Sequence, residues 1–155
     1  MDLKSAKQMS EGGIQFVAHT GLRVVEMRGG YVKCVMPFEG NGNHIGTMYA
    51  GALFTLADIA AGALFLASFD AAQYFAVVKQ LDLRFLKPAN GDVTVECTMS
   101  EDEISALSTE VAQRSKADFI LESELIGGSG TVVAKSRGVF QMRKRATSGA
   151  WVPNV

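Results

Sequence analysis

Residues 48–69 constrain the fold more than any other part of the chain, because these 22 residues carry a single charge, Asp58. A segment of this length could span a bilayer. However, Asp58 lies near its centre, where inserting a charge costs about 2.5–3.5 kcal/mol, and no Lys or Arg anchors flank it. We therefore expect a helix, ending near residue 68, that is buried in a folded domain and does not insert into a membrane.

The rest of the chain is typical of a sheet. Alternating apolar and polar residues, bounded by Gly, Pro and Asn, predict strands. The expected strands are 22–28, 31–38, 74–86, 92–99, 118–126 and 131–142. In 74–86 we expect one apolar face, with Lys79 in the same row, made of Phe75, Val77, Leu81, Leu83 and Phe85. Two further helices are expected, at 4–18 with a break at Gly12-Gly13 and at 101–116.

These elements predict an α+β fold. A helix that is apolar on all sides and lies against a sheet needs the sheet to curl around it. We therefore expect five or six mainly antiparallel strands curled around one long apolar helix. A length of 155 residues fits a single domain, 1–155. Its core is expected over 14–142, and an irregular tail over 143–155.

Composition excludes several classes of protein. Fifteen basic and sixteen acidic residues give a net charge of −1, which argues against a nucleic-acid partner. Cys34 and Cys97 have no metal-ligand spacing, so we expect buried, reduced thiols. The charged start of the chain does not resemble a signal peptide, and we expect a cytoplasmic protein. No nucleotide-binding, nucleophile-elbow or zinc motif is present, and no metal or cofactor is expected.

Asp58 is the first candidate for chemistry. A carboxylate on an apolar helix needs either a partner or a proton. Burial raises the pKa of such a group, which suits a general base or a nucleophile. The alternative is a structural ion pair with a strand cation, either Lys79 or Arg84. The residues expected to share its face are Gly51, Phe54, Thr55, Ala61, Gly62 and Phe65.

The loop before the helix is the second candidate. Asn41, Gly42, Asn43, His44 and Gly46 lead into the helix, with Thr47 as the expected N-cap. Free amides at a helix N-terminus can hold a carbonyl oxygen that becomes an oxyanion. The alternative is an ordinary capped turn.

Residues 43–58, Asn-His-Ile-Gly-Thr-Met-Tyr-Ala-Gly-Ala-Leu-Phe-Thr-Leu-Ala-Asp, resemble the signature of hotdog-fold acyl-CoA thioesterases of the phenylacetate-pathway (PaaI-like) type. Residues 77–92 resemble the strand and turn that follow it in that family. The order of elements matches over roughly 14–142. The resemblance implies the hotdog fold and hydrolysis of acyl-CoA thioesters.

The resemblance also implies roles for individual residues. Asp58 would be the general base or nucleophile, Asn43 would orient water or the thioester, and the backbone N–H of Ala50 would form the oxyanion hole. Two subunits would pair into a homodimer or homotetramer, with each Asp58 facing the loop of the other chain. The other residues implied to bind substrate are His44, Gly46, Thr47, Tyr49, Gly51 and Lys79.

Coenzyme A is the carrier that the resemblance implies. The acyl chain would run into an apolar slot beside the helix, lined by Leu53, Phe54 and Phe65. Lys87 or Arg143 would meet the nucleotide phosphates.

The chain departs from the family pattern at two places. The family's His-Gly-Gly is Tyr49-Ala50-Gly51 here, and a strand position that often carries Ser or Thr is Val78. These differences leave open a protein of the same fold that binds acyl thioesters without cleaving them, as a sensor or accessory subunit. A hydratase or dehydratase on this fold would have to use His44.

Overall fold

The computed structural model describes residues 1–145. Four helices and six strands follow one another along this part of the chain. They are α1 (Leu3–Gly12), α2 (Gln15–Thr20), β1 (Arg23–Arg28), β2 (Tyr31–Met36), α3 (Ala50–Ser68), β3 (Tyr74–Phe85), β4 (Val93–Thr98), α4 (Glu101–Arg114), β5 (Lys116–Gly127) and β6 (Val132–Lys144).

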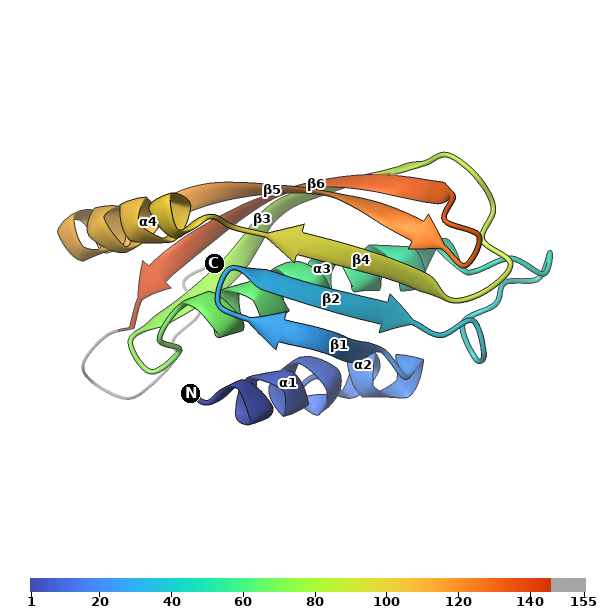
Figure 1. The fold of residues 1–155 in the computed structure, drawn as a ribbon, viewed down its shortest axis with the longest axis horizontal. Helices are drawn as coiled ribbons and strands as arrows, with labels where there is room; N and C mark the ends of the chain where they lie inside the picture. The colour runs from blue at the N-terminus through green and yellow to red at the C-terminus, as the bar shows by residue number, and fades with distance from the viewer. Residues whose placement is uncertain (146–155) are drawn as a thin grey trace.

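The strands form one antiparallel sheet in the order β1-β2-β4-β5-β6-β3. Figure 1 shows the long strands β3, β5 and β6 curving over one side of the molecule, with α3 behind β2 and β4. The sheet therefore curls around α3, and β1 and β3 are its two edges. This arrangement confirms the predicted α+β class and its curled antiparallel sheet.

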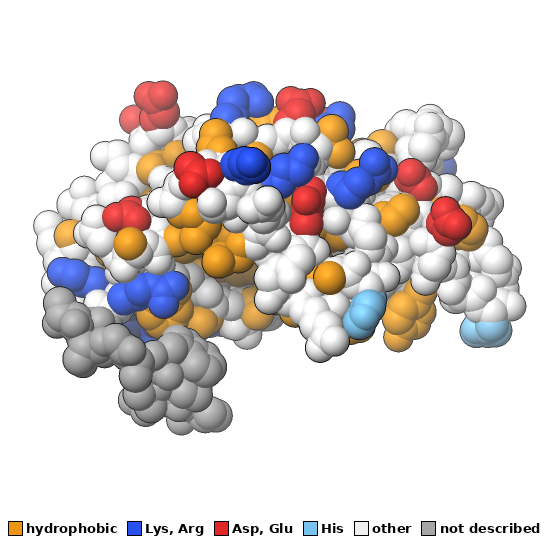
Figure 2. Space-filling view, turned by 90° about the horizontal axis from the view of Figure 1, so that it is seen from below, with side chains coloured by type: hydrophobic (Ala, Val, Ile, Leu, Met, Phe, Trp, Pro, Cys, Tyr) orange, Lys and Arg blue, Asp and Glu red, His pale blue; other side chains and the backbone are white. Residues whose placement is uncertain are grey.

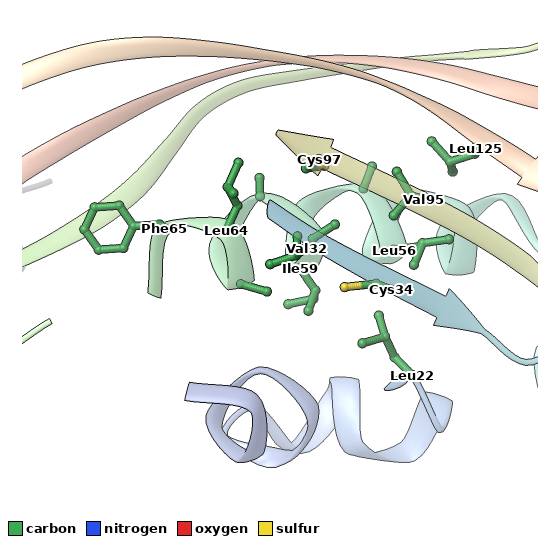
Figure 3. Close-up of a cluster of buried hydrophobic side chains, with 14 of the residues drawn as sticks. Leu22, Val32, Cys34, Leu56, Ile59, Leu64, Phe65, Val95, Cys97 and Leu125 are labelled. Carbon is green, nitrogen blue, oxygen red and sulfur yellow. The ribbon is translucent and has the colours of Figure 1, made fainter. Parts of the chain in front are cut away.

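Helix α3 supplies the centre of the core. Its buried side chains pack against those of β2 and β4, as the cluster in Figure 3 shows for Leu56, Ile59, Val32 and Val95. By length and composition alone α3 could cross a membrane. In the fold it is mostly buried by the sheet, as its apolar sequence predicts.

Local signals fix the remaining helices. The first helix is broken after Gly12, as expected, and Asp2 caps its start by accepting from Ser5 N. Ser100 and Glu103 form a reciprocal capping box at the start of α4. The start of the expected irregular tail at residue 143 is wrong, because β6 continues to Lys144. The rest of that expectation falls on residues 146–155, which lie outside the described part of the chain.

The expected single apolar face of β3 is wrong. A β-bulge leaves Lys79 as an extra residue between Val78, opposite Phe140, and Gln80, opposite Val139. One inserted residue reverses the faces of the strand beyond it. Leu81 and Leu83 therefore pack against the core, whereas Phe75 and Val77 belong to the opposite face.

Cys34 and Cys97 lie on neighbouring strands and are buried and reduced. Cys34 pairs with Val95 and Cys97 with Val32, so the two cysteines are diagonal neighbours. Diagonal Cα atoms lie about 7–8 Å apart, beyond the usual reach of a disulfide. Burial raises the pKa of Cys34 to about 12 and that of Cys97 to about 11.

These thiols are expected to be inert in the folded protein. Raising a thiol pKa from 9.0 to about 11 lowers its thiolate fraction about 100-fold at pH 8. Reaction with 5,5′-dithiobis(2-nitrobenzoate) should therefore be at least about 100-fold slower in native protein than in denaturant. Rapid titration of either thiol without unfolding would contradict this burial.

Candidate active site

The loop that leads into α3 is closed by backbone hydrogen bonds. Asn43 N donates to Thr47 O at 2.7 Å, and Gly46, with φ of 82°, makes the turn between them. At the base of the loop, Tyr49 N donates to Asn41 O at 2.8 Å, and Met48 N donates to Ala89 O at 2.8 Å. The loop is therefore fixed to itself and to the segment that joins β3 to β4.

The side chain of Asn43 organises this loop. Its Oδ1 accepts from Ile45 N at 3.0 Å and from Thr47 N at 3.1 Å, and its Nδ2 donates to Thr47 Oγ1 at 2.9 Å. His44 and Gly46 are exposed in the same turn. The predicted role of Asn43 in orienting water or a thioester remains a prediction.

Thr47 is not the N-cap, contrary to expectation. The N-cap is Tyr49, whose side chain makes no capping hydrogen bond. The bond from Tyr49 N to Asn41 O keeps the chain extended for two residues beyond Thr47. Among residues 1–145, no hydrogen-bond partner is found for the amides of Ala50 and Gly51, which open the helix. These free donors lie at the positive end of the α3 dipole.

Asn41 is a positioning residue that the sequence did not single out for its side chain. It is buried, and its Nδ2 donates to Thr20 O at 2.7 Å and to Pro37 O at 2.9 Å. It therefore ties the start of the loop to the end of α2, while its own carbonyl holds Tyr49. The sequence offers only the place of Asn41 in an Asn- and Gly-rich loop as a signal, because its burial, which requires its amide to be hydrogen-bonded, appears only in the structure.

Asp58 lies on the one open stripe of α3. This stripe is narrower than the helix face predicted from the sequence, because Ala61 and Phe65 of that predicted face are buried in the core. Its members recur at helical spacing and are half-buried or exposed: Gly51, Phe54, Thr55, Asp58 and Gly62. Thr55 Oγ1 donates to Gly51 O at 2.8 Å.

The carboxyl of Asp58 is half-buried, and burial raises its pKa above the ordinary value of 3.8. No ion pair or hydrogen bond to this carboxyl occurs within residues 1–145. A carboxylate that is desolvated and has no partner within its own chain can serve as a base or a nucleophile, because its raised pKa makes it a better proton acceptor.

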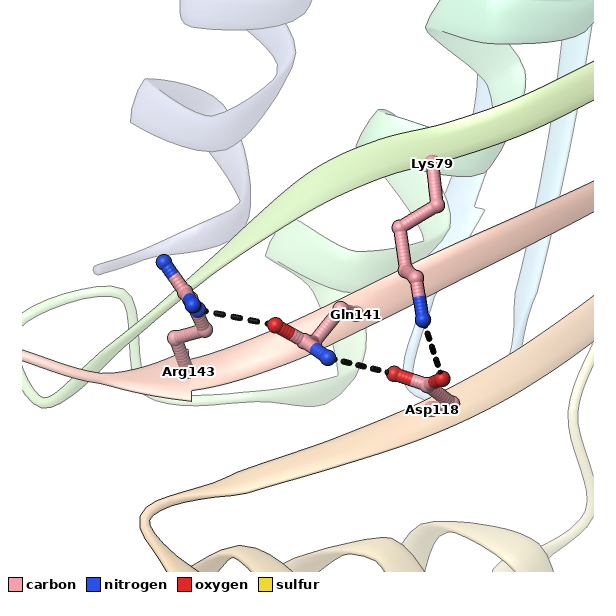
Figure 4. A network of polar contacts seen from close by, with 4 residues as sticks. All are labelled: Lys79, Asp118, Gln141 and Arg143. Carbon is pink, nitrogen blue, oxygen red and sulfur yellow. Dashed lines mark hydrogen bonds and ion pairs between the residues drawn. The ribbon is translucent and has the colours of Figure 1, made fainter. Parts of the chain in front are cut away.

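Lys79, one of the two cations considered as an alternative partner of Asp58, pairs with a different carboxylate. Lys79 Nζ lies 2.6 Å from Asp118 Oδ2, and Gln141 links Asp118 to Arg143 (Figure 4). Asp118 is exposed between the buried Ala117 and Phe119, so this network lies on the face of the sheet away from α3. The pairing of Asp58 with Lys79 is therefore wrong, because the bulge directs Lys79 to the outer face.

Other expected site residues are spread over the molecule. Leu53 and Phe65 are buried core residues, and only Phe54 of the predicted slot is exposed. Lys87 lines an open hollow of about 460 Å³ between the segment joining β3 to β4 and the β5–β6 turn. Arg143 pairs with Phe75 near the start of β3, at the opposite end of the sheet from Ala89 and the start of α3.

Figure 2 shows the surface from below. Charged side chains gather along the upper part of this face, with exposed apolar side chains beneath them. Within residues 1–145, no group of three His, Cys, Asp or Glu side chains is placed to hold a metal ion.

Asp58 and the free amide of Ala50 cannot act on one carbonyl within a single chain. They are eight residues apart on the same helix, which corresponds to about 12 Å along its axis. Reacting groups must approach to about 3 Å. Each chain thus carries both kinds of group, but at two separated places.

The comparisons with known proteins agree with this architecture. The family model described as "Domain of unknown function (DUF4442)" matches residues 7–142, so the chain belongs to this family. None of the curated proteins compared with it matches significantly.

Among solved structures, PA5026 from Pseudomonas aeruginosa is 46% identical, with a TM-score of 0.88, covering 94% of this chain and 97% of the other. That protein is described as of unknown function and a "Probable Thioesterase". A protein of unknown function from Chlorobaculum tepidum is 18% identical, with a TM-score of 0.81, over 92% and 94% of the two chains. The thioesterase HI1161 from Haemophilus influenzae is 12% identical, with a TM-score of 0.74, over 97% and 96%.

The likeness to PA5026, together with the curled sheet around α3, confirms the hotdog fold and the predicted resemblance to its thioesterases. The two more distant structures support the fold alone.

Asp58→Asn is expected to stabilise the protein at neutral pH. Because the folded state raises the pKa of Asp58, ionising this carboxyl costs folding free energy. The cost is absent below the unfolded pKa, near 3.8, and is complete above the folded pKa. Thermal unfolding should therefore give Asp58→Asn a higher Tm than wild type at pH 7, with the difference closing below about pH 4. A lower Tm at pH 7 would show that the carboxylate has a stabilising partner.

Proposed function

We propose that this protein hydrolyses acyl-CoA thioesters at a site shared by two copies of the chain. The observation that carries the proposal concerns helix α3 within the described residues 1–145. There the half-buried Asp58 has no partner, and the helix begins with two amides that make no hydrogen bond. The 46% identity to a protein described as a probable thioesterase supports the same activity.

The reaction needs few groups. The thioester carbonyl oxygen accepts a hydrogen bond from Ala50 N–H, which stabilises negative charge on that oxygen as the tetrahedral intermediate forms. Asp58 either removes a proton from the attacking water or itself attacks the carbonyl carbon. If water attacks, the C–S bond then breaks, the sulfur leaves and takes up the proton held by Asp58, and the products are a carboxylic acid and a thiol. If Asp58 attacks, breaking the C–S bond releases the thiolate, which takes a proton from solvent, and leaves an acyl anhydride on Asp58; water then hydrolyses this anhydride to the carboxylic acid and restores the carboxylate.

The distance of about 12 Å between the two groups in one chain supports a shared site. In a pair of chains with the open stripes of α3 facing each other, Asp58 of one copy lies near Ala50 of the other. Each pair then holds two equivalent sites. A homodimer or homotetramer satisfies this requirement, whereas an isolated chain does not.

Coenzyme A is the proposed carrier of the acyl group. The hollow that contains Lys87 adjoins the active-site loop, because Ala89 in its lining accepts the bond from Met48. Lys87 is exposed there and can meet a phosphate. Arg143 and Lys79 lie on the outer face and are less suited to this role within the same chain.

The first test is thiol release from a panel of acyl-CoA thioesters that varies in chain length and aromatic character. The proposal predicts saturable turnover of at least one class, at a rate above the protein-free control. Absence of turnover across the panel, with tight binding of an acyl-CoA, would favour the alternative function. That alternative, a non-catalytic acyl-thioester binder, is favoured by one observation, the replacement of the family's histidine by Tyr49.

A further inference from the structure

The ring of Tyr49 rests on Gly51. A Cβ atom at position 51 would overlap Cε1 of this ring and lie 3.0 Å from both Cδ1 and Cζ. Contacts this close are not tolerated between carbon atoms, so a side chain at position 51 and the present ring position exclude each other. Glycine at 51 therefore leaves room for the ring.

This contact does not serve the core. Tyr49 is 58% exposed, so its burial contributes little to stability. Within residues 1–145 its hydroxyl makes no hydrogen bond. The ring folds back over the first turn of α3, at the end of the stripe that continues through Thr55 to Asp58.

Two features thus meet at the start of α3. The free amides of Ala50 and Gly51 are the donors of the proposed oxyanion hole. The ring of Tyr49 lies against Gly51, the second of these two residues. A group bound to these amides would therefore have an aromatic ring as a neighbour on one side.

We propose that the Tyr49 ring, seated on Gly51, is the wall that positions the thioester against the Ala50 amide. This inference rests on the proposed function and concerns the same site. Tyr49 acts by contact with the substrate through its ring, and Gly51 is a positioning residue that acts through Tyr49. The hydroxyl of Tyr49 takes no part in proton transfer.

The test is a double-mutant cycle between positions 49 and 51. Gly51→Ala displaces the exposed ring while the helix persists, because Ala is a better helix former than Gly. We expect Gly51→Ala to raise KM at least about tenfold with a smaller change in kcat, because the substrate is less well positioned. Its Tm should be equal to or above that of wild type.

In a Tyr49→Ala background there is no ring to displace, so Gly51→Ala should change KM by less than about twofold. Tyr49→Phe keeps the ring and should stay within about threefold of wild type. Gly12→Ala is the matched control, because a Cβ there meets nothing within 4 Å and the residue lies in α1.

Two results would contradict the proposed role of the Tyr49 ring. One is an equal effect of Gly51→Ala with and without the Tyr49 ring, and the other is a loss in Tyr49→Phe as large as in Tyr49→Ala. The same double-mutant cycle can be measured without turnover, from the Kd of each variant for a non-hydrolysable acyl-CoA thioether. A wild-type protein that neither hydrolyses nor binds acyl thioesters would refute the proposed function itself. If the wild type is active but the effects of the two substitutions on KM are simply additive, only the proposed role of the Tyr49 ring is refuted.

Discussion

Asp58→Asn is expected to lower kcat for thioester hydrolysis by about 100-fold or more, the range that follows the loss of a positioned proton-transfer group. The amide keeps the size of the side chain but can neither accept the proton of water nor attack the carbonyl. Because burial raises the pKa of Asp58, the same change should not harm folding at neutral pH. Activity and stability are thus expected to move in opposite directions.

Steady-state thiol release measures this effect, with Tm recorded on the same samples. Asp82→Asn is the matched control, since Asp82 is an exposed carboxylate on β3 that accepts from Gln80. Equal, weak activity of wild type and Asp58→Asn would remove Asp58 from the mechanism and leave it as a carboxylate without a catalytic role.

Ala50→Pro is expected to lower kcat by about 100- to 1,000-fold, the usual effect of removing one oxyanion-hole donor. In proline a ring carbon takes the place of the amide hydrogen, so residue 50 can no longer donate a backbone hydrogen bond. The first position of a helix is the place where proline is well tolerated. Tyr49, with φ of −62° and ψ of 136°, already has the extended backbone that a residue before proline adopts.

The comparison variant is Ala50→Ser, which keeps the N–H at an exposed position and should retain most of the activity. Circular dichroism and Tm establish that the proline variant keeps α3. A folded Ala50→Pro protein with wild-type kcat would show that the Ala50 amide does not hold the substrate oxygen.

The core of the fold could be predicted from the sequence because it depends on local patterns. The apolar run around Asp58 predicts a buried helix, and the alternation of Val93, Val95 and Cys97 predicts an inward face that the structure confirms. Each of these signals is repeated many times, so a few exceptions do not change the fold.

The predictions that proved wrong concern details that depend on single contacts between distant segments. The bulge at Lys79 is one extra residue, which a pattern of alternation cannot show, and it decides that Lys79 meets Asp118 and not Asp58. The start of α3 depends on bonds from Met48 to Ala89 and from Tyr49 to Asn41, which no local capping rule contains. The contact of the Tyr49 ring with Gly51 likewise appears only in the structure.

The most direct test of the shared site is to mix two inactive variants, Asp58→Asn and Ala50→Pro, after dissociating and reassociating the chains. In a mixed pair, one site combines the intact Asp58 of one copy with the intact Ala50 of the other, and the second site has neither. Random pairing makes about half of the pairs mixed, so about one quarter of the wild-type sites should return. Recovery of activity to about this level is the predicted result, and a mixture no more active than its two parents would contradict a site shared between two chains.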